Sequence, residues 1–140
     1  MEREILFKAK NKEWNEWVEG DLIHEPFGEC IQFIKDGCRS KVKINPETVC
    51  QYTGLTDKNG RKIFEGDIVK YHFGEDVAPI KFGSYQSCFD SQQTEHCGFY
   101  VDWKAERNFR KDLGYWVHMV DAEILGNIFD NPELLKGDGK

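Results

Sequence analysis

The amino-acid sequence predicts a mainly β protein, built as a small twisted antiparallel sheet or a partly open barrel of about seven or eight strands, with a short C-terminal helix. Aromatic residues make up 14% of the chain and hydrophobic residues 39%. This composition favours a core of rings packed on sheets. Turn-forming residues also divide the sequence into short apolar runs, which is typical of strands joined by tight turns.

The chain length predicts one domain, because 140 residues are enough to bury a core without disulfides or a metal. Within this single domain, residues 1–140, we expect two β subregions and a tail. The N-terminal subregion covers residues 1–50 and the C-terminal subregion residues 51–135. Residues 136–140 are expected to fray.

The N-terminal part of the chain predicts four strands. Apolar runs at residues 3–9 and 17–23 are separated by a polar loop, which predicts a hairpin. Residues 30–34 and 41–44 predict two further strands. The last of these alternates lysine with an apolar residue, the period expected of a half-buried strand.

Two short helical turns are predicted from their caps. Asn45 can cap a turn that has Pro46 at its first helical position. Near the C-terminus, Asn131 precedes Pro132, and Glu133 falls in the first turn of a predicted helix, where its charge suits the helix dipole.

The stretch QYTGLTDKNGRKIFEGDIV, residues 51–69, has the strongest turn signal in the chain. Asn59 and Gly60 favour a type I′ hairpin turn, because both tolerate positive φ. This turn would place Asp57 opposite Lys62 as a cross-strand ion pair. The segment is interpreted as scaffold, with two cations at its tip left available to a partner: Lys58 and Arg61.

The remainder of the chain predicts further strands around a long polar loop. Residues 104–111 have a helix-compatible composition, and residues 83–98 form the predicted loop. The predicted strands are residues 68–73, 78–82, 98–103 and 115–120.

Three blocks of sequence resemble the YopX-like family of phage and prophage proteins. The central block and the closing block are the most specific, and the opening strands are similar too, so the resemblance spans nearly the whole chain. The blocks are residues 5–9 and 17–22, residues 52–69, and residues 124–135. The resemblance implies a β-rich fold and a phage-encoded origin, and it supplies no catalytic residues. The chain departs from the family pattern at residues 74–98.

Charge and cysteine content exclude several classes of protein. A net charge of −6 argues against binding duplex DNA by phosphate neutralisation alone. The apolar runs are too short to span a membrane, so no membrane partner is expected. Five cysteines without regular spacing, and no signal-peptide pattern after Met1, lead us to expect reduced thiols in a cytoplasm. The family resemblance implies that this is the cytoplasm of a bacterial host cell.

One basic and aromatic segment could bind single-stranded nucleic acid. Its cations are Lys104, Arg107, Arg110 and Lys111, with Trp103 and Phe109 interleaved. Such a segment can stack bases on its rings and follow the phosphates with its cations. The hairpin cations and a second basic group could extend it: Arg39, Lys41 and Lys43. Alternatively, the spacing describes the solvated side of a short helix with both rings in the core.

Three other kinds of residue group could serve as a metal site, a nucleophilic pair or paired acids, and each gives only a weak signal. Cys88, His96 and Cys97 are zinc-ligand types, with His72 or Cys50 as a conceivable fourth ligand. Their spacing matches no paired motif, so scattered thiols are the favoured interpretation. A nucleophilic pair of Cys97 with His118 lacks an orienting group. Two acidic pairs are interpreted structurally, Glu65 with Asp67 as a turn and Asp121 with Glu123 as the solvent face of a strand.

These observations predict a non-catalytic phage or prophage accessory protein that needs no cofactor. It would bind a macromolecule, a protein in the first instance, through exposed loops and strand edges, with self-association as an alternative. The second hypothesis is a single-stranded nucleic-acid-binding module, and the third is a metal-dependent enzyme.

Overall fold

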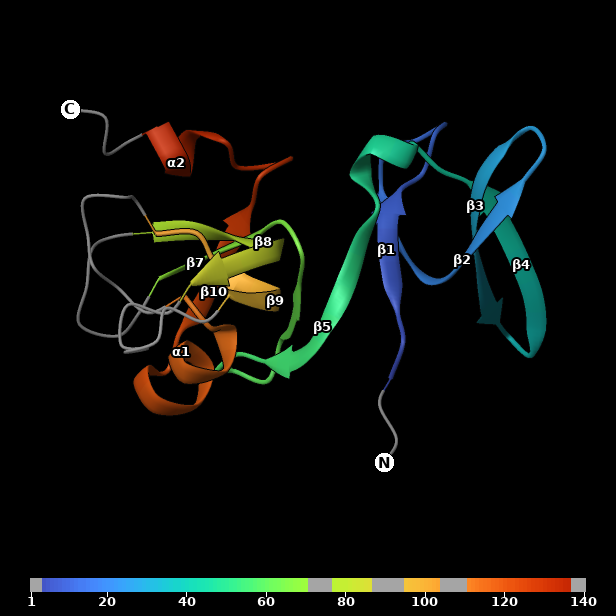
Figure 1. Ribbon diagram of the computed structural model, residues 1–140. Coiled ribbons are helices and arrows are strands. Elements are labelled where there is room, and N and C mark those ends of the chain that lie inside the picture. The colour runs from blue at the N-terminus through green and yellow to red at the C-terminus, as the bar shows by residue number, and fades with distance from the viewer. Residues whose placement is uncertain (1–3, 71–76, 87–94, 104–110, 137–140) are drawn as a thin grey trace. The chain divides into compact units, whose positions relative to one another are not determined.

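The computed structural model describes residues 4–70, 77–86, 95–103 and 111–136, which form two antiparallel sheets (Figure 1). Within these ranges neither sheet closes into a barrel, and the α-helices are short. The predicted mainly β class is therefore confirmed. The described residues form ten strands arranged as two sheets, whereas the sequence predicted about seven or eight strands in one sheet. Contacts along the chain divide it into two units, Met1–Gly54 and Leu55–Lys140.

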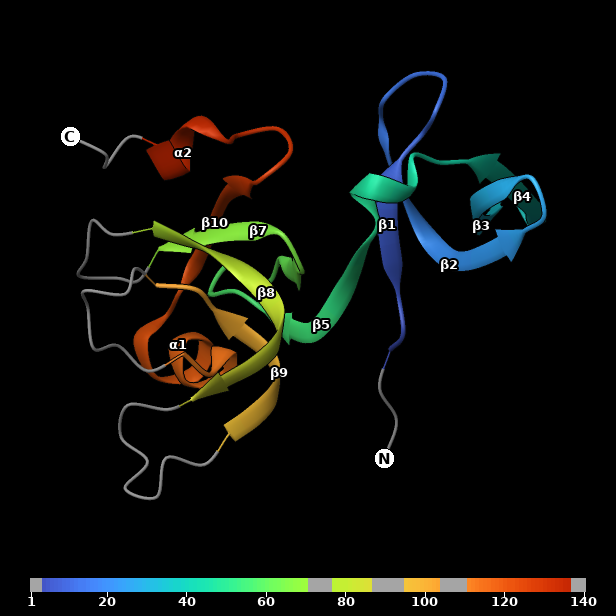
Figure 2. The same cartoon turned by 45° about the horizontal axis from the view of Figure 1, so that its top comes forward.

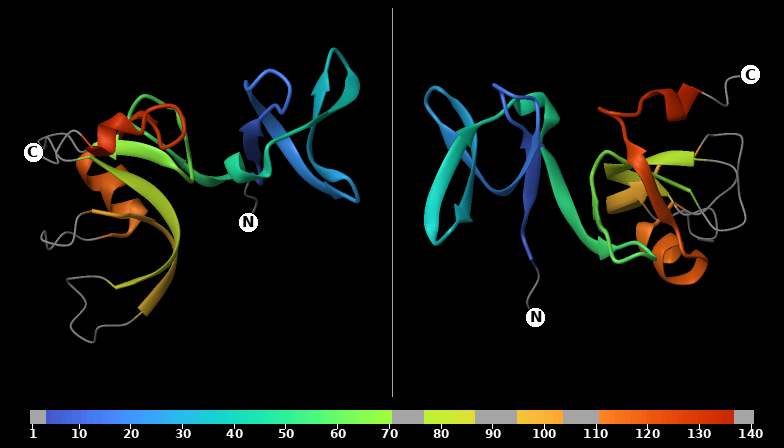
Figure 3. Two further views of the ribbon diagram at one scale, coloured as in Figure 1. Left: turned by 90° about the horizontal axis from the view of Figure 1, so that it is seen from above. Right: turned by 180° about the vertical axis from the view of Figure 1, so that it is seen from behind.

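The first unit contains most of a six-stranded sheet in the order β4-β3-β2-β1-β5-β6. The end of β5 and all of β6 belong to the second unit. The bounds are β1 Phe7–Lys10, β2 Trp17–Glu25, β3 Gly28–Lys35, β4 Cys38–Lys43, β5 Cys50–Thr56 and β6 Lys62–Phe64. Figures 1 and 3 show β4 at the margin of the first unit.

The core of the first unit is small. Ala9, Ile31 and Ile44 are fully buried, and they come from β1, from β3 and from the residue that follows β4. Partly buried residues surround them: Phe7, Val18, Leu22, Phe33, Val42 and Val49.

A 3-10 turn follows the fourth strand, as the sequence predicted. This turn, η1 (Pro46–Thr48), begins after Asn45, whose side chain accepts a hydrogen bond from the Glu47 N–H at 3.1 Å. The buried Thr48 hydroxyl accepts from the Lys10 N–H at 2.8 Å, so the turn is fastened to β1.

The type I′ turn predicted at Asn59 and Gly60 is wrong. The Gly60 N–H donates to the Asp57 carbonyl at 3.0 Å, and the Asp57 N–H donates to the Arg61 carbonyl at 2.8 Å. Of the two predicted central residues, only Gly60 has a positive φ, 80°. The connection is therefore a three-residue loop with glycine in the left-handed position, and Asp57 lies opposite Arg61 instead of Lys62.

The two-residue geometry occurs elsewhere, between β3 and β4. Asp36 and Gly37 have φ values of 54° and 79°, and Lys35 pairs with Cys38 on either side of them. Both central residues therefore have the positive φ that a type I′ turn requires.

The second unit is built on a four-stranded sheet in the order β10-β7-β8-β9. Its strands are β7 Asp67–Lys70, β8 Val77–Gln86, β9 Glu95–Val101 and β10 Glu123–Asn127. β8 and β9 pair from Ile80 opposite Val101 out to Gln86 opposite Glu95. The predicted loop at residues 83–98 is therefore wrong at both ends, and residues 87–94 lie outside the described part. Figure 2 shows the paired ends of β8 and β9 curving away from β7 and β10.

The strand predicted at residues 115–120 is also wrong, because these residues lie in helix α1 (Leu113–Val120). The Asp112 side chain caps the helix by accepting from the Tyr115 N–H at 3.3 Å. Leu113 and Trp116, three positions apart, are buried on one face. Residue 121 is the left-handed C-cap of α1 rather than part of a strand.

The predicted C-terminal helix is confirmed as α2 (Glu133–Lys136). Figures 1 and 3 show α1 and α2 on opposite sides of the four-stranded sheet. The core of the second unit is larger than that of the first and lies between the sheet and α1. Its buried members are Ile63, Val69, Ala78, Ile80, Val101, Trp103, Leu113, Trp116, Ala122 and Ile124.

Among the described residues, no helix has the length and apolar content required to cross a membrane.

Candidate binding surfaces

The two cations at the hairpin tip are engaged by the chain itself. The Lys58 ammonium lies 3.3 Å from the Glu123 carboxylate. The Arg61 guanidinium donates to the Ile124 carbonyl at 3.3 Å. The sequence led us to expect that both cations would be available to a partner. Instead, their side chains fasten the loop to the start of β10.

Asp57 completes this attachment. Its buried carboxylate accepts hydrogen bonds from the backbone N–H groups of Asn59 at 3.0 Å and Arg61 at 2.9 Å through one oxygen. The other oxygen accepts from the Ile124 N–H at 3.0 Å. The predicted ion pair with Lys62 is therefore wrong, because backbone donors occupy the carboxylate. We call Asp57, Lys58, Arg61, Glu123 and Ile124 the hairpin latch.

Most of the basic segment at residues 104–111 lies outside the described residues: Lys104, Arg107, Phe109 and Arg110. Lys111 is described, and its ammonium lies 6.0 Å from the centre of the Tyr100 ring. Its carbonyl accepts from the Val101 N–H at 2.8 Å, which places it beside β9. Trp103 is buried in the core. The alternative interpretation of this segment, a short helix with its rings in the core, predicted this burial.

The described geometry separates the zinc-ligand candidates. His96 and Cys97 are neighbours in β9, so their side chains project to opposite faces of the sheet. His96 stacks on Tyr85, whereas Cys97 lies opposite Ser84. In the part of the chain that is described, no group of three or more His, Cys, Asp or Glu residues is arranged to hold a metal. Cys50 is buried; Cys88 and His72 lie outside the described residues.

The remaining candidates have structural positions. The buried Asp67 carboxylate accepts from the Phe64 N–H at 2.8 Å, which confirms the turn interpretation of Glu65 and Asp67. His118 is exposed in the last turn of α1, on a different element from Cys97.

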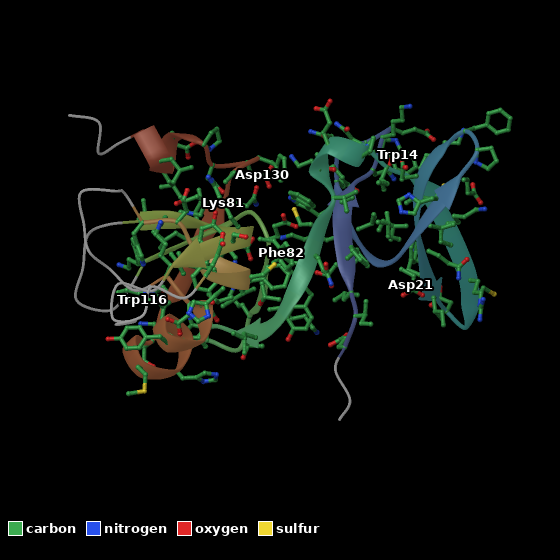
Figure 4. The ribbon with its side chains drawn as sticks, viewed as in Figure 1. Trp14, Asp21, Lys81, Phe82, Trp116 and Asp130 are labelled. Atoms are coloured by element: carbon green, nitrogen blue, oxygen red, sulfur yellow. The ribbon has the colours of Figure 1, made fainter. Side chains whose placement is uncertain are left out.

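The β8–β9 hairpin carries rings on both faces. On the face continuous with the core, Phe82 meets Phe99 edge to face with ring centres 5.0 Å apart. Phe82 remains 55% exposed. Figure 4 shows Phe82 on β8 and Trp116 on α1.

The opposite face of the hairpin holds a row of three rings. Tyr85 lies between His96 and Tyr100, with ring centres 5.4 and 5.3 Å away. Because Gly83 carries no side chain, the Tyr100 ring can extend over it toward Tyr85. The rings contact one another through their faces, so the row stabilises the hairpin.

β4 is an edge strand of its sheet, and some of its backbone groups point away from β3. Its pairing with β3 starts at Lys35 opposite Cys38, after a two-residue turn. In such a hairpin the closing pair is hydrogen-bonded, and successive pairs alternate between bonded and non-bonded. Three residues therefore direct their N–H and C=O groups away from β3: Arg39, Lys41 and Lys43.

One contact confirms this alternation. The Lys12 N–H donates to the Lys43 carbonyl at 3.0 Å from the side of β4 that faces away from β3. Asn11 also bridges Ile44, so Lys12 lies opposite Lys43 and the open part of the edge is at Arg39 and Lys41. On the other side, the Ile44 N–H donates to the Glu29 carbonyl at 3.1 Å. We call Arg39, Lys41 and Lys43 the β4 edge; within the described residues its other outward backbone groups have no hydrogen-bond partner.

The side chains of the β4 edge form a cationic row on one face of the sheet. All three residues are exposed. Lys41 contacts the Glu25 carboxylate, which also accepts a hydrogen bond from the Cys30 thiol at 3.5 Å. The hydrogen bond from Lys41 lowers the pKa of Glu25, whereas burial, followed by the bond to Glu25, raises the pKa of Cys30. Arg39 and Lys43 have no ion-pair partner in the described part of the chain.

The cations of β4 are visible in the sequence, where they were predicted to extend a nucleic-acid surface. The signal that identifies an edge was present, since lysine alternates with small or apolar residues at residues 40–43. Charged residues on alternate positions of an edge strand are a common way to control strand pairing. Sequence alone did not show that β4 ends the sheet.

Comparison with known proteins gives a family and a fold. A family model described as YopX protein matches residues 6–136. The crystal structure of protein EF1440 from Enterococcus faecalis is similar at 19% sequence identity, with a TM-score of 0.53, and the match covers 96% of this chain and 99% of that one. No curated protein matches the sequence. At this identity the structural match supports the fold alone.

Proposed function

We propose, from the premise that the chain belongs to the YopX family, that it is a non-catalytic phage or prophage accessory protein that binds another protein in the bacterial cytoplasm. The observation that carries this proposal is the β4 edge. It combines outward backbone groups that lack partners in the described residues with exposed cations.

An open edge of this kind is a recognised mode of protein binding. An extended segment of a partner can add to the sheet, so that main-chain hydrogen bonds supply affinity and side chains on alternate positions supply specificity. The buried carboxylates of Asp57 and Asp67 accept hydrogen bonds from backbone N–H groups, which gives these acids a structural role. These observations support a binding role for the chain.

Site-specific photo-crosslinking in cells tests this proposal. A photoreactive residue replaces Cys38, which is exposed at the start of β4. The matched control carries it at Asp21, which is exposed on β2 in the same unit and labelled in Figure 4. We expect the Cys38 variant to capture one protein, in the bacterium that encodes the chain, that the Asp21 variant does not. Equal capture by the two variants, or none, would contradict the proposal.

A second candidate function is single-stranded nucleic-acid binding on the β8–β9 hairpin. The observation in its favour is Lys111 beside Tyr100, at the end of the row of rings. Titration with single-stranded and duplex oligonucleotides at low and moderate salt tests it. Weaker binding by Lys111→Glu would support this function, and absence of binding by the unmodified chain at low salt would remove it.

A further inference from the structure

We infer that the β4 edge binds an acidic segment of a partner protein in extended conformation, added to the sheet as an antiparallel strand. This inference rests on the proposed function and specifies the chemistry of its ligand. Two acidic side chains on alternate positions of the segment would face Arg39 and Lys41, and a third would approach Lys43 at the end of the paired region.

An acidic strand is inferred because outward backbone groups and positive charges occur on the same residues. The residues whose N–H and C=O groups point outward are the same residues that carry the cations. In an antiparallel ladder, two residues that exchange hydrogen bonds lie directly opposite each other, with side chains on the same face. A partner residue bonded to Arg39 or Lys41 therefore places its own side chain beside that cation, where an acid is favoured.

Charge also argues against a second copy of β4 as the occupant. Two β4 strands paired edge to edge would bring Arg39 and Lys43 of each copy toward the cations of the other. Like charges directly opposite one another destabilise a pair of strands. The same row that prevents such pairing would attract a segment of opposite charge.

The contact from Lys12 limits the length and register of the added strand. The Lys12 N–H donates to the Lys43 carbonyl and Asn11 bridges Ile44, so Lys12 already lies opposite Lys43, and the added strand can pair only with Arg39 and Lys41. A partner residue beyond the one opposite Lys41 makes no backbone hydrogen bond to β4, so its N–H is dispensable. The N–H groups of the partner residues opposite Lys41 and Arg39 are both required.

Peptide binding tests this geometry. The probe is a peptide Thr-Glu-Thr-Glu-Thr-Glu-Thr with blocked ends and a fluorescent label, titrated against the full chain by anisotropy. In the antiparallel register its second Glu lies opposite Lys41 and its third opposite Arg39, and its first Glu lies beyond the paired residues, near Lys43. Methylation of the backbone nitrogen of the second and third Glu should weaken binding about tenfold or more, because these N–H groups face β4. Methylation of the two Thr nitrogens between the Glu residues, or of the first Glu nitrogen alone, should change affinity less than about twofold.

The charge requirement has its own controls. Lys43→Glu should weaken binding of the Glu peptide about tenfold and strengthen binding of the same peptide made with Lys. Lys35→Glu, which changes an exposed lysine outside the row, should leave affinity within about twofold. Amide exchange by NMR should show new protection at the N–H groups of Arg39 and Lys41. It should show none at Ser40 or Val42, whose N–H groups already bond to β3.

Several outcomes would overturn the inference. If methylation of the second and third Glu nitrogens left the affinity of the peptide unchanged, the edge would attract any anion. The same conclusion would follow if a single-stranded oligonucleotide bound as tightly as the peptide. Concentration-dependent self-association that Lys43→Glu changes and Lys35→Glu leaves unchanged would identify a second copy as the occupant. Failure of the peptide to bind, together with specific crosslinking at residue 38, would reject the acidic strand and leave the proposed function standing. Absence of crosslinking would reject the proposed function itself.

Discussion

Asp57 is the residue on which the hairpin latch depends. Its buried carboxylate accepts three backbone N–H groups, two from its own loop and one from Ile124. Asp57→Ala would leave these donors without an acceptor, so we expect the free energy of unfolding to fall by about 3 kcal/mol. Urea unfolding followed by circular dichroism measures the loss. Asp21→Ala, which truncates an exposed aspartate on β2, should stay within about 0.5 kcal/mol of the unmodified chain.

Cys30 and Cys38 should differ in reactivity although both lie on the β3–β4 hairpin. Burial, together with the bond to Glu25, raises the pKa of Cys30. Less thiolate is therefore present at neutral pH, and the thiolate is the reactive form. Cys38 is exposed. Iodoacetamide labelling followed by mass spectrometry should show Cys38 modified first, with the two rates converging in urea. Similar rates in the folded chain would contradict this arrangement.

At the scale of elements, one substitution should have opposite effects in a turn and in a helix. Gly37 has φ +79°, which an alanine adopts only with strain. Gly114 lies in α1, outside the left-handed region and with open space around its Cα. We expect Gly37→Ala to destabilise by about 1 kcal/mol and Gly114→Ala to stabilise by about 0.5 kcal/mol. Thermal unfolding of both variants checks the signs, and a shared sign would contradict one of the two assignments.

Local signals predicted some elements and misplaced others for identifiable reasons. Asn45 with Pro46 and Asn131 with Pro132 marked real turns, because a cap acts over three or four residues. Residues 115–120 combine aromatic and β-branched side chains, which favour a strand, yet burial of Leu113 and Trp116 on one face selects a helix. The type I′ turn failed for a similar reason, since the contact of Asp57 with Ile124 joins residues that lie far apart in the sequence.

The residues of the candidate site could be predicted from the sequence, but the direction of their backbone groups could not. The alternation at β4 can be read from sequence, and Arg39, Lys41 and Lys43 were identified as a basic group. Their outward backbone groups depend on β4 being the last strand of the sheet, which is a property of tertiary pairing. Likewise, Lys58 and Arg61 read as free cations until their contacts with β10 are seen.

At the scale of the molecule, two separate cores imply two levels of stability. The first unit buries three hydrophobic residues in its cluster and the second ten. Ile31→Ala should remove about 2–5 kcal/mol from the first core. Hydrogen exchange should then lose protection at residues 7–44 more than at residues 63–124. Ile80→Ala, in the second core, is the matched control and should reverse the pattern. Uniform loss of protection in either variant would show a single cooperative transition.

The hairpin latch also bears on how the chain is made. Its deepest hydrogen bond joins residues 67 positions apart. At a synthesis rate of about 5 to 20 residues per second, the ribosome adds the residues between Asp57 and Ile124 over roughly 3 to 13 seconds. During that interval the loop that contains Asp57 has been synthesised, but β10, which supplies the Ile124 N–H, has not. The second unit therefore acquires this hydrogen bond only after β10 has been synthesised.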